Sequence, residues 1–252
     1  MQTLGGDLLK VSGVCFDYDQ DSSIFDNLNF NLSAGQILGV AGANGAGKST
    51  LLDLLAGLLE PSQGQILLEG RLGADWLRRG SSLVPQNVDL FILGATARED
   101  LSIGLVGGLE AWLNKGEDLG GQNYQEELID RWGLGSFLDK RVESLSVGQK
   151  KRLALASSLA ARARLVLLDE PFAGLDWEAS LNLMKDLKTL RLLGAAVVLT
   201  THEPAAVIDL VDSWLLLKPG AHLWASGEEA VGRFVDFGTR PFNNKKSKLG
   251  SL

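Results

Sequence analysis

The segment at residues 42–49 (GANGAGKS) constrains the fold more than any other part of the chain. It has the spacing G-x-x-x-x-G-K-[S/T], in which glycines allow backbone N–H groups to turn inward around phosphate oxygens. An apolar run at 36–41 precedes it, and leucines at helical spacing follow over 48–58. This order predicts a strand, a phosphate-binding loop and a helix whose N-terminal end attracts anions. A plain glycine-rich turn is the alternative, but such a turn would not require a strand before it and a helix after it.

Lys48 in this loop is expected to reach the β- and γ-phosphates of a nucleotide, and Ser49 to bind Mg²⁺. The residues of the loop and of the first helical turn that we expect to contact the nucleotide are Gly42, Asn44, Gly45, Gly47, Lys48, Ser49 and Thr50.

A second candidate site follows the apolar run at 165–168, where Asp169 and Glu170 stand together. Ligands of open α/β sheets bind at the C-terminal ends of buried strands, so two carboxylates there predict a functional site. Asp169 is expected to hold Mg²⁺, and Glu170 to polarise an attacking water, because phosphoryl transfer needs positioning and charge neutralisation. Alone, the pair also fits a solvated acidic turn, which Pro171 favours locally.

The organisation of the chain predicts an α/β fold with two additions. Residues 8–16 and 24–32 favour strands and predict a small antiparallel sheet near the N-terminus. Apolar strand-like runs at 165–168 and 195–200 each follow a helical stretch, which predicts a parallel α/β core. Between the core segments, residues 87–163 have a helical pattern with glycine-rich joints and predict an inserted helical subdomain.

Composition excludes some classes of protein. The net charge of −7 argues against a chain that binds nucleic acid or anionic lipid through its overall charge. The single cysteine, Cys15, cannot form an intrachain disulfide, which fits a reducing compartment and predicts a buried packing role. The N-terminus lacks the pattern of a signal peptide, and no apolar run approaches the ~20 residues that span a membrane. Any membrane association is therefore expected to be peripheral.

Further motifs give the chain a specific resemblance. Gln86 follows a strand-like segment, residues 145–149 read LSVGQ, residues 173–176 read AGLD, and His202 follows a pair of threonines. Together with the two sites above, and in this order, they resemble the nucleotide-binding subunit of an ATP-binding cassette (ABC) transporter over residues 8–227. The resemblance implies a P-loop NTPase core at 1–86 and 164–239, an N-terminal antiparallel β subdomain, a helical subdomain at 87–163 and a polar tail at 240–252.

The resemblance also implies roles at the hydrolysis site, with ATP as the nucleotide. Gln86 resembles the glutamine that contacts Mg²⁺ and the attacking water at the hinge of the helical subdomain. His202 resembles the histidine that hydrogen-bonds the γ-phosphate, and its charge is tunable near neutral pH. Lys48, Gln86, Glu170 and His202 are thus the expected catalytic residues, and Ser49, Gln86 and Asp169 the expected Mg²⁺ ligands. Without the other motifs, we would interpret Gln86 as a surface turn residue and His202 as a histidine without a functional role.

The pentapeptide LSVGQ implies a second subunit. In the family this signature contacts the γ-phosphate of ATP held by the opposite subunit, and Ser146, Gly148 and Gln149 match it. Val147 departs from the usual glycine, and since a β-branched residue resists a positive φ, we expect either extended backbone there or an altered contact across the dimer. Taken alone, LSVGQ would be a helix N-cap formed by Ser146.

The resemblance implies two further nucleotide contacts, an adenine-stacking role for Tyr18 and a place for Asp176 in the loop at 173–176. Packing or simple exposure is the alternative for Tyr18.

Residues 84–104 (VPQNVDLFILGATAREDLSIG) indicate a subgroup. They resemble the ATPases of energy-coupling factor (ECF) and cobalt-type importers, in which this region docks on a transmembrane coupling protein, although Val88 stands where that group usually has proline. The resemblance implies a homodimer or a heterodimer with a paralogue, at the cytoplasmic face of the membrane, that powers import of a vitamin or transition-metal ion. An exporter subunit, a non-transport ABC ATPase and a catalytically silent module remain alternatives. Substrate and direction of transport do not follow from the sequence.

Overall fold

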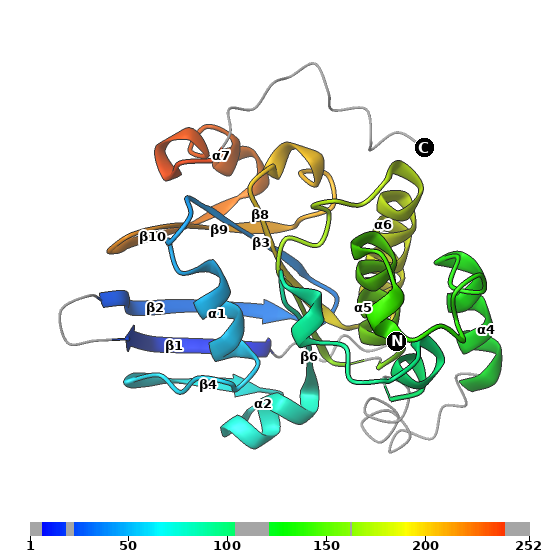
Figure 1. Ribbon diagram of the computed structural model, residues 1–252. Coiled ribbons are helices and arrows are strands. Elements are labelled where there is room, and N and C mark those ends of the chain that lie inside the picture. Colours follow the sequence, from blue (N-terminus) through cyan, green and yellow to red (C-terminus); the bar gives the residue numbers. More distant parts are fainter. Residues whose placement is uncertain (1–6, 19–22, 104–120, 162, 240–252) are drawn as a thin grey trace.

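The computed structural model describes residues 7–18, 23–103, 121–161 and 163–239. Two β-sheets and a set of helices make up this part of the chain (Figure 1). The predicted polar tail at 240–252 lies outside the described residues.

The N-terminal sheet is antiparallel, as predicted. It has the order β2-β1-β4-β5 and is formed by β1 (Asp7–Asp17), β2 (Ser23–Ser33), β4 (Gln63–Leu68) and β5 (Arg71–Leu72). Val14 and Phe16 on β1 are buried, whereas Cys15 between them is only half-buried. The prediction of a buried cysteine was therefore wrong, because successive side chains of a strand point to opposite faces.

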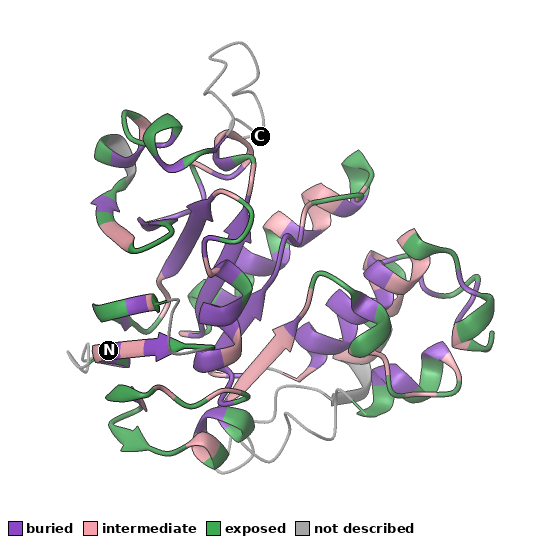
Figure 2. Ribbon diagram, turned by 60° about the vertical axis from the view of Figure 1, so that its left-hand side comes forward, coloured by how far each residue is buried: buried purple, intermediate pink, exposed green. Residues whose placement is uncertain are grey.

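The second sheet has the order β10-β9-β3-β8-β7-β6. Its strands are β3 (Ile37–Gly42), β6 (Ser81–Val84), β7 (Leu165–Leu168), β8 (Ala196–Thr201), β9 (Ser213–Lys218) and β10 (Ala221–Ser226). All neighbours pair in parallel except β9 and β10. Every residue of β3, β7 and β8 is buried, which explains their uninterrupted apolar sequences: layers cover both faces of the sheet (Figure 2).

The α-helices with defined bounds are α1 (Lys48–Leu55), α2 (Ala74–Gly80), α4 (Gly121–Arg131), α5 (Val147–Ala160), α6 (Trp177–Leu192) and α7 (Gly227–Val231). Short 3₁₀ helices occur at η1 (Val88–Leu90), η2 (Val142–Ser144), η3 (Pro204–Ala206) and η4 (Val235–Phe237). Helix α1 ends before the predicted residue 58 because Gly57 adopts a left-handed φ of 70°.

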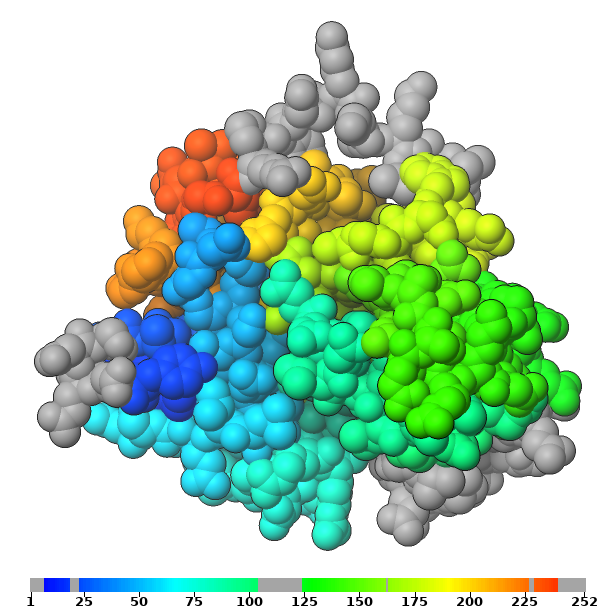
Figure 3. Space-filling view, viewed as in Figure 1, coloured from blue at the N-terminus to red at the C-terminus, as the bar shows by residue number. Residues whose placement is uncertain are grey.

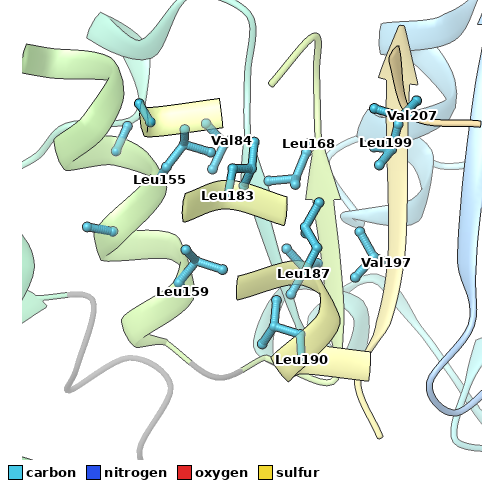
Figure 4. Close-up of a cluster of buried hydrophobic side chains, with 14 of the residues drawn as sticks. Val84, Leu155, Leu159, Leu168, Leu183, Leu187, Leu190, Val197, Leu199 and Val207 are labelled. Carbon is cyan, nitrogen blue, oxygen red and sulfur yellow. The ribbon is translucent and has the colours of Figure 1, made fainter. Parts of the chain in front are cut away.

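The parallel sheet separates two hydrophobic clusters. On β7, Leu165 and Leu167 face the cluster that contains α1 and the antiparallel sheet, whereas Val166 and Leu168 face the other. On that second face the leucines of α5 and α6 pack against the strands; Figure 4 shows Leu155, Leu159, Leu183, Leu187 and Leu190 in this layer. Helix α1 is thus held between the two sheets, and α5 is held against the opposite face of the parallel sheet.

The described segments between β6 and β7 gather on one side of the molecule, away from the antiparallel sheet (Figures 1 and 3). A buried carboxylate joins these segments to the core. Asp186 on α6 accepts a hydrogen bond from Trp132 Nε1 at 2.8 Å and forms an ion pair with Arg131. The limits of the helical subdomain, residues 87–163, stay a prediction.

Within the described residues, no helix is both long enough and apolar enough to span a bilayer.

Candidate functional site

The loop between β3 and α1 has the backbone that its glycines predict. Gly47 has a φ of 93°, and a Cβ atom added to it would lie 2.6 Å from Ile24 Cγ2. A Cβ on Gly42 would lie 2.2 Å from the carbonyl oxygen of Leu217 on β9. Only glycine satisfies both positions, so the chain folds into a tight concave loop at the N-terminal end of α1. Such a loop can direct N–H groups at a phosphate.

Lys48 begins α1 and is buried. Its Nζ donates hydrogen bonds to the carbonyl oxygens of Gly42 at 2.9 Å and Ala43 at 3.1 Å. Burial lowers the pKa of Lys48, while the carboxylates of Glu170 and Asp169 act in the opposite direction. A positive charge is thereby held inside the loop, where it can meet a nucleotide phosphate.

Asp169 connects the loop to the end of the sheet. One carboxylate oxygen accepts a hydrogen bond from Ser49 Oγ at 2.7 Å, and the other accepts one from Thr200 Oγ1 at 2.6 Å. The structure therefore brings together the two predicted Mg²⁺ ligands, Ser49 and Asp169, from opposite halves of the chain. A hydroxyl and a carboxylate are hard oxygen donors, and Mg²⁺ usually takes one or two carboxylates with phosphate and water, so these residues fit the ion.

Glu170 has an unusual backbone and a buried carboxylate. Its φ is 50°, a left-handed conformation that non-glycine residues rarely adopt, and its N–H donates to Thr200 Oγ1 at 2.9 Å. The N–H of His202 donates to Oε2 of Glu170 at 3.3 Å, and Nε2 of His202 lies 3.1 Å from Oε1. Backbone strain of this kind persists where the surroundings hold it and clusters at functional sites. The predicted base and histidine thus face each other.

Gln86 lies exposed just after β6, at the same edge of the sheet. The N–H of Asp169 donates to Val84 O at 2.9 Å, so Gln86 follows the strand that directly neighbours the acidic pair.

Tyr18 follows β1 and is 58% exposed. Its hydroxyl lies 3.1 Å from Thr50 Oγ1 on α1, and Phe16 supports its ring edge-on. The ring is therefore largely exposed beside the start of α1, and its role in adenine stacking stays a prediction.

The signature residues form a helix start. Ser146 Oγ accepts a hydrogen bond from the N–H of Gln149 at 3.3 Å, and Gln149 Oε1 accepts one from the N–H of Ser146 at 2.9 Å. This capping box satisfies the first turn of α5. Val147 is the first residue of the helix and is 81% exposed, so the extended backbone that we expected does not occur, and the alternative, an altered contact across the dimer, stays a prediction. A Cβ added to Gly148 would meet no described atom within 4 Å.

Asp176, predicted to contact nucleotide, caps α6. Its Oδ1 accepts the N–H of Ala179 at 2.8 Å, and its Oδ2 accepts a hydrogen bond from Arg152 on α5 at 2.7 Å. Both oxygens are therefore engaged within the chain, which favours a structural part in ordering the loop at 173–176.

Two contributors were missed. Thr200 bridges Asp169 and Glu170, and the sequence signal was a polar residue ending an apolar strand. Lys151 donates from α5 to the carbonyl oxygens of Glu170 and Ala173, and no sequence signal distinguishes it from its polar neighbours Lys150 and Arg152.

Comparison with known proteins shows the family. The family model described as "ABC transporter" matches residues 25–173. The chain belongs to the ABC transporter family. A second, shorter match, to a model described as "AAA domain, putative AbiEii toxin, Type IV TA system", covers residues 138–209. ABC ATP-binding domains are ATPases, so the predicted enzyme class and the predicted α/β P-loop fold are confirmed.

Similar proteins include several transporter ATP-binding proteins. A putative ABC transporter ATP-binding protein of Halobacterium salinarum is 32% identical over 93% of this chain and 100% of its own length. One of Bacillus cereus is 34% identical over 85% of this chain, which spans only 38% of that relative. The energy-coupling factor transporter ATP-binding protein EcfA1 of Streptococcus pyogenes is 32% identical over 91% of this chain and 85% of its own length.

Solved structures agree in fold. The structure of cbiO1 from Clostridium perfringens, described as part of the ABC transporter complex cbiONQ, has 29% identity and a TM-score of 0.72 over 91% of this chain and 92% of that one. An ATP-binding subunit of an ABC transporter superposes with a TM-score of 0.76 at 24% identity, over 92% of this chain and 95% of that one, which supports the fold alone. This ABC ATPase is therefore similar to the ECF and cobalt-type group that residues 84–104 indicated.

Proposed function

We propose that this ABC ATPase hydrolyses ATP at composite sites of a dimer and powers an ECF-type importer of a vitamin or transition-metal ion. The observation that carries the catalytic part is the network in which Ser49, Asp169, Thr200, Glu170 and His202 are joined by hydrogen bonds or close contacts. The importer type is supported by the likeness to EcfA1 and cbiO1. An exporter subunit is the alternative, and a non-transport ATPase is a more distant one.

In this proposal Glu170 accepts the proton of the attacking water. His202 orients the carboxylate and the γ-phosphate, and Lys48 stabilises negative charge on the β- and γ-phosphates. Gln86 joins the site from the end of β6. Ser49 and Asp169 would hold Mg²⁺, which supplies charge neutralisation when bound.

A second subunit would complete each site through the signature. A Cβ added to Gly148 would meet no described atom within 4 Å, and Val147 is largely exposed, so there is room for a partner at the start of α5. A helix N-terminus attracts anions, which fits the γ-phosphate of ATP held by the partner. We therefore propose that Ser146, Gly148 and Gln149 serve the partner's nucleotide, in a homodimer or a paralogous heterodimer.

The membrane partner would dock beside η1. Leu90 and Leu93 are 76% and 74% exposed, while Val88 between β6 and this surface is buried. Lys150 at the start of α5 forms an ion pair with Asp89 at 2.7 Å, which links η1 to the signature helix. Leu90 ends η1 and Leu93 follows it, and exposed leucines of this kind fit an apolar groove of a transmembrane subunit. The chain would then lie peripherally at the cytoplasmic face of the membrane.

The test uses the full chain, purified with the membrane proteins that accompany it. Glu170→Gln should lower ATP turnover by about 100-fold or more, because general base catalysis contributes about 10²–10⁴. Glu126→Gln is the matched control, since Glu126 is exposed on α4. An unchanged rate in Glu170→Gln would remove the general base assignment, and an inactive wild-type complex would favour a silent module. Uptake or extrusion by vesicles that contain the complex decides between importer and exporter.

A further inference from the structure

Lys151 lies on the first turns of α5, yet its side chain is turned inward and is 8% exposed. Its Nζ donates hydrogen bonds to the carbonyl oxygen of Glu170 at 2.8 Å and to that of Ala173 at 2.6 Å. No part of the proposed reaction uses this lysine. Burying an ammonium group is unfavourable unless polar partners compensate, and the two carbonyl oxygens supply this compensation for Lys151.

The segment that Lys151 holds is the one that carries the general base. The carbonyl oxygen of Glu170 also accepts the N–H of Ala173 at 3.2 Å, so the lysine reinforces a tight turn directly after the acidic pair. Glu170 has the left-handed φ of 50° described above, a conformation that needs support from its surroundings. The N–H of Glu170 is fixed by Thr200 and its carbonyl by Lys151, so both of its own backbone polar groups have a partner.

The neighbouring residue of α5 holds the other end of the same segment. Arg152 donates to Asp176 at 2.7 Å, which caps α6. Residues 170–176 are therefore attached at both ends to the helix that begins at the signature. Burial lowers the pKa of Lys151, but the charges of Glu170 and Asp169 favour the protonated form, so the acidic pair and the ammonium support each other.

We propose that Lys151 is a positioning residue for the general base: by binding the carbonyl oxygens of Glu170 and Ala173, it fixes the backbone from which the Glu170 carboxylate projects. Because Lys151 belongs to α5, the position of Glu170 is set by the same helix that presents Ser146 to the partner. The proposal rests on the function proposed above, in which Glu170 is the base.

The test measures ATP turnover of the purified complex with Lys151→Met, which keeps the length of the side chain and removes its charge and donors. A displaced base should lower kcat between about 10-fold and 100-fold, since misplacement by about 1 Å has effects of that size. KM for ATP should stay within about twofold, because Lys151 hydrogen-bonds Glu170 and Ala173, and neither of these residues is expected to bind the nucleotide. Lys151→Arg, which retains charge and donors, should restore most of kcat. Lys188→Met is the control, since Lys188 is exposed on α6.

A double variant separates positioning from general damage. In a Glu170→Gln background, Lys151→Met should lower the residual turnover no further, because residues that act as one unit are not additive. A further loss of 10-fold or so in the double variant, or a kcat of Lys151→Met equal to that of Lys188→Met, would overturn the proposal. If Glu170→Gln itself retained full turnover, the proposed function would fail instead, so the two failures are distinguishable.

Discussion

Replacement of Thr200 by valine tests the bridge between the acidic pair and the sheet. Thr200 is fully buried, and valine has nearly its shape, so the change leaves no cavity and removes only the hydroxyl. That hydroxyl accepts the N–H of Glu170 and donates to Asp169. The N–H is then buried without a partner, which destabilises the fold by about 1–3 kcal/mol, and loss of a donor to a charged carboxylate adds to it.

The expected loss is therefore about 2–3 kcal/mol, or a melting temperature lower by about 5–10 °C, because 1 kcal/mol shifts a chain of this size by about 2–4 °C. Thermal unfolding of the nucleotide-free chain, followed by circular dichroism, measures it. Thr189→Val is the control: Thr189 is exposed and its hydroxyl bonds only a carbonyl of its own helix, so we expect less than about 0.5 kcal/mol. A Thr200→Val variant that melts with the wild type would refute the assignment of Thr200 as the bridge.

Three further predictions concern other parts of the molecule. Burial, and secondarily the charge of Asp169, raises the pKa of Asp53. A raised folded pKa means stability that is lost as pH rises through it, so the melting temperature of Asp53→Asn should gain on that of the wild type as pH rises above the ordinary aspartate pKa. A difference in melting temperature that does not change with pH would contradict this prediction. Asp186→Ala should lower the free energy of unfolding in urea by about 3–5 kcal/mol, because it breaks a buried ion pair with Arg131. Asp139→Ala removes an exposed ion pair and should change this free energy by less than about 1 kcal/mol. Equal effects of the two substitutions would contradict the prediction. Val147→Gly should leave the melting temperature nearly unchanged, since the side chain is exposed. Altered ATP-driven dimerisation of this variant would indicate that Val147 contacts a partner subunit. Unchanged dimerisation and turnover would show that Val147 has no tuning role.

The sequence predicted those features that depend on local patterns. The antiparallel sheet followed from alternating residues on β1 and β2, and the buried parallel strands followed from uninterrupted apolar runs such as Leu165–Leu168. The phosphate loop followed from glycines whose positions the backbone requires. The fold class, the family and the enzyme class are confirmed, while the residue roles and the domain limits stay predictions.

The features that were missed depend on contacts between distant segments. No local pattern shows that Glu170 has a positive φ, because the conformation is held by Thr200 and Lys151, which are 30 and 19 residues away. The in-chain use of Asp176 likewise depends on Arg152, which only the packing of α5 beside α6 brings near. Strand β9 was not anticipated, although its burial and its contact with Gly42 set the shape of the loop.

The place of β3 in its sheet has a consequence for the order of assembly. Both of its neighbours, β8 and β9, come from the last quarter of the chain, and the N–H of Ala43 donates to Phe237 O at 3.0 Å. On a ribosome, where the N-terminal part emerges first, the antiparallel sheet can pair long before β3 has any strand beside it. The phosphate loop is thus translated well before the strands that fix it. A nascent chain acquires its ATP site only when synthesis of the described domain is almost complete.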